Sequence, residues 1–162
     1  MKKRFFLAFV LTAAAGGALH FLYPLCPSPL TAILAPVNES VWEHLKMLFW
    51  PFLAAAFFLV RKQPDRPRAW SAFLAALLSM PPALTAAYYL LKGGFGAESV
   101  WLDLALYILT LAFGFALSAR LLQSGRAEKH LGLLIALSAI FGVALTVFSF
   151  AAPPLPIFTP SA

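Results

Sequence analysis

Five long apolar runs place the strongest constraint on how this chain of 162 residues can fold. They cover about residues 5–22, 41–60, 69–91, 100–122 and 131–152. Runs of roughly 18–23 residues, at about 1.5 Å rise per helical residue, are long enough to cross a bilayer core of ~30 Å. Hydrophobic residues make up 62% of the chain and charged residues only 11%, a balance unlike that of soluble domains. The chain is therefore predicted to be an integral membrane protein with about five spans.

The spans are predicted to be α-helices. Inside lipid the backbone must satisfy its own hydrogen bonds, which only helices and closed barrels achieve. The sequence lacks the short alternating segments that are typical of a barrel. No stretch resembles a separate soluble domain, and no internal repeat is evident. We therefore expect an all-α polytopic fold in which residues 1–162 form a single transmembrane helical domain.

The basic residues predict the orientation of this bundle, because Lys and Arg collect in the short cytoplasmic loops of membrane proteins. Ten of the 12 basic residues precede the first span or lie in the connections after the second and fourth spans: Lys2, Lys3, Arg4, Arg61, Lys62, Arg66, Arg68, Arg120, Arg126 and Lys129. The N-terminus is therefore predicted to be cytoplasmic and the C-terminus extracytoplasmic. This distribution explains the net charge of +6 as an orientation signal. We expect the lipid bilayer, and no nucleic acid, as the partner of these residues.

The N-terminal segment allows a second interpretation. Basic residues, an apolar run and small residues follow one another there, as in a secretory signal peptide. We expect the segment to stay in place as the first span, and its cleavage would leave the later topology unchanged. The single cysteine, Cys26, excludes an intrachain disulfide and a cysteine-rich metal site.

A proline-rich stretch, residues 24–37, forms the first predicted outer loop. Its four prolines oppose a regular helix, so we expect a stiff turn with one short helical piece near residues 31–34. The loop either lies in the membrane interface or dips into the membrane as a cap over the bundle. In both cases Asn38, which follows the loop, is predicted to lie at the outer face.

The residues that follow, 38–46, concentrate polar side chains in an otherwise apolar chain. Ser40 and Glu43 have the spacing of a capping box, in which each side chain accepts a hydrogen bond from the other residue's amide. Glu43 and Lys46 lie three residues apart and can form an ion pair on a helix. Capping does not account for His44, and ionisable groups inside a membrane span indicate a functional site by default.

Two other spans bring polar residues to the same predicted depth. Gly16 and His20 lie four residues apart in the first span, so His20 is predicted to face a neighbouring helix that packs closely at the glycine. Glu98 and Asp103 lie at the outer start of the fourth span. Asp103 is the strongest single polar signal outside residues 38–46. Polar and ionisable side chains from several spans are therefore predicted to lie close together near the outer surface of the membrane.

This convergence suggests a metal-assisted membrane hydrolase with an outward-facing site. Histidine nitrogens and carboxylate oxygens are ligands that Zn²⁺ accepts, and the predicted metal ligands are His20, Glu39, His44 and Asp103. Glu43 is predicted to be the catalytic acid–base group, and Lys46 the cation that stabilises developing negative charge. The sequence contains no compact ligand motif such as H-E-x-x-H, so the site would have to be assembled from three helices.

Transport is the alternative function. The same acids and histidines would bind an ion, a proton or a small solute, with Pro51 or the pair Pro81 and Pro82 as a moving joint. The lack of inverted repeats and the odd number of spans argue against a monomeric carrier, whereas a homo-oligomer could conduct. In a third interpretation the protein is an accessory or structural protein, and the polar motif fixes helix packing or docks a partner.

The polar segment also carries a resemblance. The run PVNESVWEHLKMLFWP, preceded by LHFLYPL, resembles a family of small bacterial multi-pass membrane proteins marked by a VNES-x-WEHLK motif. The matching positions are His20, Tyr23, Asn38, Glu39, Ser40, Trp42, Glu43, His44, Lys46 and Pro51. No activity is established for this family. The resemblance implies bacterial origin and a membrane location, but no function. We expect the protein to lie in the bacterial cytoplasmic (inner) membrane.

Overall fold

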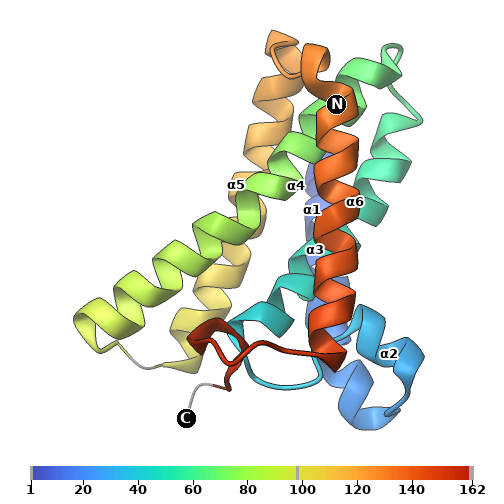
Figure 1. Cartoon of the computed structure of the whole chain (residues 1–162). Coiled ribbons are helices and arrows are strands. Elements are labelled where there is room, and N and C mark those ends of the chain that lie inside the picture. The colour runs from blue at the N-terminus through green and yellow to red at the C-terminus, as the bar shows by residue number, and fades with distance from the viewer. Residues whose placement is uncertain (1, 98, 161–162) are drawn as a thin grey trace.

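The computed structural model describes residues 2–97 and 99–160, and within them the regular elements are all helical (Figure 1). The long helices are α1 (Lys2–Leu25), α3 (Val41–Val60), α4 (Arg66–Tyr88), α5 (Val100–Ser124) and α6 (Leu131–Phe150). The short elements are α2 (Pro29–Leu34), the π-helical turn η1 (Tyr89–Gly94), and the 3-10 turns η2 (Glu128–His130) and η3 (Pro156–Phe158). Glu98, which the sequence assigned to the outer polar region, lies outside the described residues.

The predicted spans are confirmed as helices. Within the described residues, five helices are long and apolar enough to cross a membrane. The chain is a multi-pass membrane protein. The third span starts earlier than predicted, at Arg66, because the Asp65 carboxylate caps the helix by accepting from the Arg68 amide at 3.1 Å. At its other end α4 continues into η1, so this helical segment reaches Gly94.

The chain runs back and forth between two ends of the bundle (Figure 1). One end holds the start of α1 and the connections after α3 and α5, and we call it the basic end because most Lys and Arg residues lie there. The opposite end holds α2 and the described residues that follow α6, and we call it the outer end. That the outer end faces away from the cytoplasm stays a prediction from the distribution of charge.

The central helices α3 and α4 carry most of the core. α4 packs against α3, α5 and α6, while α1 packs against α3 and α5. The rings of Phe52, Phe73 and Phe115 meet between three of these helices, with Phe52 centred 5.0 Å from Phe115 and 5.9 Å from Phe73. α3 remains helical through Pro51, and α4 through Pro81 and Pro82. This packing holds the first turns of α3 in the interior at the outer end.

Two segments cover the outer end of α3. The predicted short helix in the proline-rich loop is confirmed as α2, which packs against α1, α3 and α6. The chain after α6 folds back so that Pro160 pairs with Ser40 in an isolated β-bridge. Phe158 from this segment lies over Trp42, with ring centroids 4.9 Å apart. The polar start of α3 is therefore enclosed on two sides by chain rather than by lipid.

Candidate functional site

The turn before α3 fixes the direction of the polar side chains. Ser40 is the N-cap of α3, and its hydroxyl accepts from the Glu43 amide at 3.4 Å, as the capping box predicts. The prediction of the reciprocal hydrogen bond is wrong, because the Ser40 amide donates to Asn38 Oδ1 at 2.9 Å instead of to the Glu43 carboxylate. Since Asn38 occupies the Ser40 amide, the Glu43 carboxylate can turn into the bundle.

Glu43 and Lys46 form an ion pair in the interior, which we call the buried pair. Their side chains are 2% and 0% exposed, and Lys46 Nζ lies 2.7 Å from Glu43 Oε2. Lys46 also donates to the backbone carbonyls of Ala32 at 2.6 Å and Ala35 at 3.2 Å. An ammonium group has three hydrogens to donate. Lys46 is therefore fully satisfied, and it points into the protein rather than toward the membrane surface.

The Glu43 carboxylate is equally occupied. Its Oε2 also accepts from the Val37 amide at 2.9 Å, and its Oε1 accepts from the Ser149 hydroxyl of α6 at 2.7 Å. Trp50, two turns further along α3, donates from Nε1 to the Ile33 carbonyl at 3.0 Å. Buried charges are tolerated when they are paired and hydrogen-bonded in this way. The buried pair thus fastens α2, the following loop and α6 to α3.

A second polar cluster, which we call the trio, consists of His20 from α1, Glu39 from the turn before α3, and His44 from α3. One ligand atom of each residue lies within 4.8 Å of the other two. Glu39 Oε2 lies 3.3 Å from His44 Nε2 and 4.0 Å from His20 Nε2. Ligands at about 2.0–2.1 Å in a tetrahedral zinc site are separated by roughly 3.3 Å. The three side chains are therefore close to the spacing that one bound metal ion requires.

A backbone hydrogen bond orients the His44 ring. His44 Nδ1 lies 2.8 Å from the Ser40 carbonyl oxygen, which can only accept. We therefore assign a hydrogen to Nδ1, so Nε2, which faces Glu39, is the nitrogen through which His44 would bind a metal ion. A histidine that ligates a metal is held in the same way, with its other nitrogen donating to a carbonyl or carboxylate. The hydrogen bond to Ser40 thus holds the His44 ring in the orientation that metal ligation at Nε2 requires.

Close packing of α1 on α3 brings His20 to this site. A Cβ on Gly16 would lie 2.5 Å from the Met47 carbonyl oxygen and 2.0 Å from the Tyr107 hydroxyl oxygen, so only glycine fits between the helices. The Tyr107 hydroxyl donates to the Ala13 carbonyl at 3.1 Å. The two helices are antiparallel, and one turn beyond this contact toward the outer end lie His20 on α1 and His44 on α3. The predicted close approach at Gly16 is confirmed.

The trio and the buried pair differ in their access to solvent. The side chains of His20, Glu39 and His44 are 35%, 63% and 30% exposed. The trio is therefore partly exposed at the surface of the bundle, whereas the buried pair is sealed by α2, α6 and the loop between α2 and α3. Two nitrogens and one carboxylate form the donor set of many catalytic zinc sites, which keep a fourth position open.

Asp103 does not join these residues. It lies outside the group of possible metal ligands formed by the trio. Its Oδ2 accepts from Lys92 Nζ at 3.0 Å, and Lys92 also lies over the Tyr88 ring, 4.9 Å from its centroid. The structure thus brings together three of the four predicted metal ligands and gives Asp103 a separate partner at the end of the α4–η1 segment.

Sequence reasoning missed four partners of the buried pair: the Ser149 hydroxyl, the Ala32 and Ala35 carbonyls and the Val37 amide. Ser149 lies in a stripe of small residues on α6 that indicates only helix packing, and its position near the outer end was the one signal of another role. The Ala32 and Ala35 carbonyls carry no side-chain signal at all. They could be found only once the path of the loop over α3 was known.

Comparison with known proteins identifies the family but adds no activity. No curated protein and no solved structure gives a significant match to the chain. The model of the family of unknown function DUF6512 matches residues 1–162. This agrees with the resemblance carried by the segment around residues 38–46. The protein is therefore a member of DUF6512, a family of unknown function.

Proposed function

We propose that the protein binds a divalent metal ion, most readily Zn²⁺, through His20, Glu39 and His44, and that it is a metal-dependent hydrolase of the bacterial cytoplasmic membrane. The convergence of the three ligand atoms within 4.8 Å carries this proposal. Three protein ligands leave one coordination position for water, and zinc makes such water a nucleophile near neutral pH. The carboxylate and the two imidazoles supply the donor types that zinc prefers.

The proposal gives the buried pair a positioning role. Glu43 and Lys46 were predicted as catalytic groups, but each is buried and engaged by several partners. A general base must reach the proton that it removes. We therefore propose that the buried pair keeps two segments in position: the turn that carries Glu39 and the first turn of α3, which carries His44. The Val37 amide bonded to Glu43 lies two residues before Glu39 and links the two clusters.

The position of the trio favours hydrolysis over transport. Substrate sites of carriers lie near the middle of the membrane, between helices that rock around them. The trio instead lies at the outer end, with side chains 30–63% exposed. A substrate at this depth would carry its scissile bond at the membrane surface. We therefore propose a small or lipid-linked substrate with a polar head group.

Metal content tests the proposal. The detergent-purified protein is stripped with a chelator, reloaded with Zn²⁺ and analysed for bound metal and for hydrolysis of ester and phosphoester substrates. We expect one zinc per chain, and a loss of affinity of more than about 100-fold in His44→Ala, beyond the 10–100-fold known for supporting groups. His130→Ala is the matched control, because this exposed histidine lies at the basic end in η2.

Equal zinc binding by His44→Ala and the unmodified protein would overturn the proposed metal site. Zinc binding without hydrolysis that depends on it would overturn the enzymatic part alone. In that case zinc-dependent solute flux in proteoliposomes would decide for the transport alternative.

A further inference from the structure

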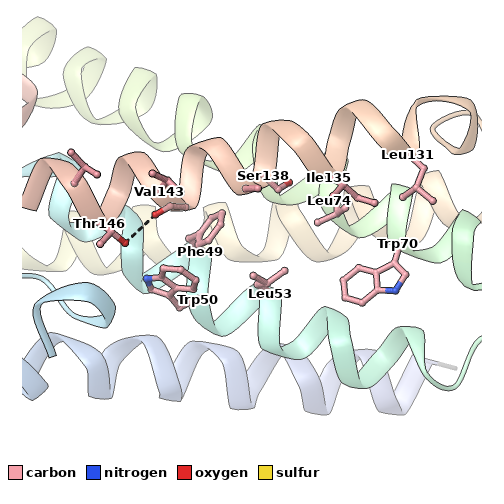
Figure 2. A pocket seen from close by; sticks show the side chains of 13 residues that line it. Phe49, Trp50, Leu53, Trp70, Leu74, Leu131, Ile135, Ser138, Val143 and Thr146 are labelled. Atoms are coloured by element: carbon pink, nitrogen blue, oxygen red, sulfur yellow. Dashed lines mark hydrogen bonds between the residues drawn. The ribbon is translucent and has the colours of Figure 1, made fainter. Parts of the chain in front are cut away.

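A long apolar groove runs along the bundle between α3, α4 and α6 (Figure 2). Its volume is about 590 Å³, within the range of roughly 300–1,000 Å³ that is typical of small-molecule sites. Trp50 and Leu53 of α3, Trp70 and Leu74 of α4, and Ile135 and Val143 of α6 form its walls. The Thr146 hydroxyl donates to the Gly142 carbonyl within α6, so this polar group is satisfied by its own helix. The groove therefore offers an almost wholly apolar surface.

The shape of the groove fits a chain that runs along the membrane normal. On α6 its lining extends from Leu131 to Val147, about 24 Å at a rise of 1.5 Å per residue. This length is most of a hydrocarbon core of about 30 Å. A helix of the same length and about 10–12 Å in diameter would fill on the order of 2,000 Å³, well above the volume of the groove. A single alkyl chain is thin enough for this volume, and a chain that enters from the basic end would occupy the part of the groove nearest that end.

Small residues on α6 keep the groove open. Gly142 lies against the Phe49 ring, and a Cβ there would approach the ring to 3.2 Å. Ala139 lines the groove and is exposed, so no side chain fills the space beside it. Ser138, one residue before, lines the same space, and its buried hydroxyl has no hydrogen-bond partner within the described residues. A larger side chain at Ala139 would occupy the groove without disturbing the core.

Positive charge lies beyond the basic end of the groove, on residues that do not themselves line it. Arg66 lies one turn before Trp70 on the same face of α4, and η2, which carries Lys129, packs against α4 close to Leu131. Among the described residues neither Arg66 nor Lys129 takes part in an ion pair. The acids at this end are Asp65, which caps α4, and Glu128 in η2. Basic pockets beside membrane helices are typical binding sites for anionic lipid head groups.

We propose that the groove binds one anionic phospholipid, with an acyl chain between α3, α4 and α6 and its phosphate against Arg66 and Lys129. The apolar lining and the volume of the groove suit an acyl chain, and the cations beyond its basic end suit an anionic head group. This site is separate from the trio and does not depend on the metal proposal. The occupant is a lipid of the leaflet at the basic end.

Native mass spectrometry with defined lipids tests the proposal. The detergent-purified protein is titrated with phosphatidylglycerol and with phosphatidylcholine of identical acyl chains. We expect one retained phosphatidylglycerol and weaker retention of phosphatidylcholine. Ala139→Trp should abolish this retention, because the indole fills the groove. Ile140→Trp is the matched control, since it adds the same indole one residue further along α6, at a 65% exposed position outside the groove lining.

Charge variants test the head-group contact. Arg66→Gln with Lys129→Gln should weaken phosphatidylglycerol about 25-fold, or about five-fold for each cation near the head group. Lys3→Gln with Lys62→Gln removes the same charge from exposed positions at the same end and should have little effect. Equal loss in both pairs, equal binding of the two lipids, or lipid retention by Ala139→Trp would overturn the proposal. So would a dimer that Ala139→Trp dissociates, because a second copy would then cover the groove.

Discussion

The buried pair and the trio come from the same short stretch, residues 38–46, together with His20, but they are built in opposite ways. In the buried pair, Glu43 and Lys46 are satisfied by each other, by Ser149 and by backbone groups, and solvent is excluded. In the trio, one nitrogen of each imidazole and one carboxylate oxygen lie within 4.8 Å of one another, and the three side chains are 30–63% exposed. A buried polar cluster whose groups satisfy one another stabilises the fold, whereas an exposed cluster of two imidazoles and a carboxylate has the donor atoms that a bound metal ion needs.

The largest expected effect is on the stability contributed by the buried pair. Lys46→Met leaves the Glu43 carboxylate buried without its cation, which should reduce the free energy of unfolding by about 3–5 kcal/mol. Unfolding in mixed detergent micelles measures this loss. The double variant Glu43→Gln with Lys46→Met removes both charges and should recover much of it. A double variant as unstable as Lys46→Met would show that the unpaired charge is not the cause.

The contact of α1 with α3 places His20 beside His44, and a larger residue at Gly16 should push these two helices apart. Gly16→Val places a side chain against the Met47 carbonyl and Tyr107, so it should destabilise the fold by about 1–3 kcal/mol. It should also weaken zinc binding, because His20 moves with α1. Gly17→Val is the control, since a Cβ there meets nothing within 4 Å. Unchanged zinc affinity in Gly16→Val would show that His20 is not a ligand.

The sequence predicts how deep in the membrane a residue lies, but not which neighbouring helix its side chain packs against. The five spans follow from apolar length, because the thickness of the bilayer sets how many residues each helix needs. The same topology placed His20, Glu39, Glu43, His44 and Asp103 near one membrane surface. Depth alone does not say where on the circumference of the bundle a side chain lies. Asp103 therefore pairs with Lys92, while the position of Gly16 against Met47 brings His20 to His44.

The ion pair between Lys92 and Asp103 provides an intermediate case. Its side chains are 21% and 43% exposed, so water screens the interaction and competes for both groups. Asp103→Asn should change the free energy of unfolding by only about 0–1 kcal/mol, and high salt should reduce the difference further. Metal binding should be unaffected. Weakened zinc binding in Asp103→Asn would instead return Asp103 to the set of ligands that the sequence predicted.

The smallest effect on the metal-free protein is expected at Glu39, whose side chain is 63% exposed. Glu39→Gln keeps the size of the residue but removes the anionic ligand, so stability without metal should change by less than about 0.5 kcal/mol, as at most surface positions. With zinc present, the difference in stability between Glu39→Gln and the unmodified protein should grow. A metal at 100 times its dissociation constant stabilises the protein that binds it by about 2.7 kcal/mol. The unmodified protein should gain this stability and Glu39→Gln should lose most of it. A zinc-dependent gain of equal size in both proteins would mean that the stabilising ion binds elsewhere.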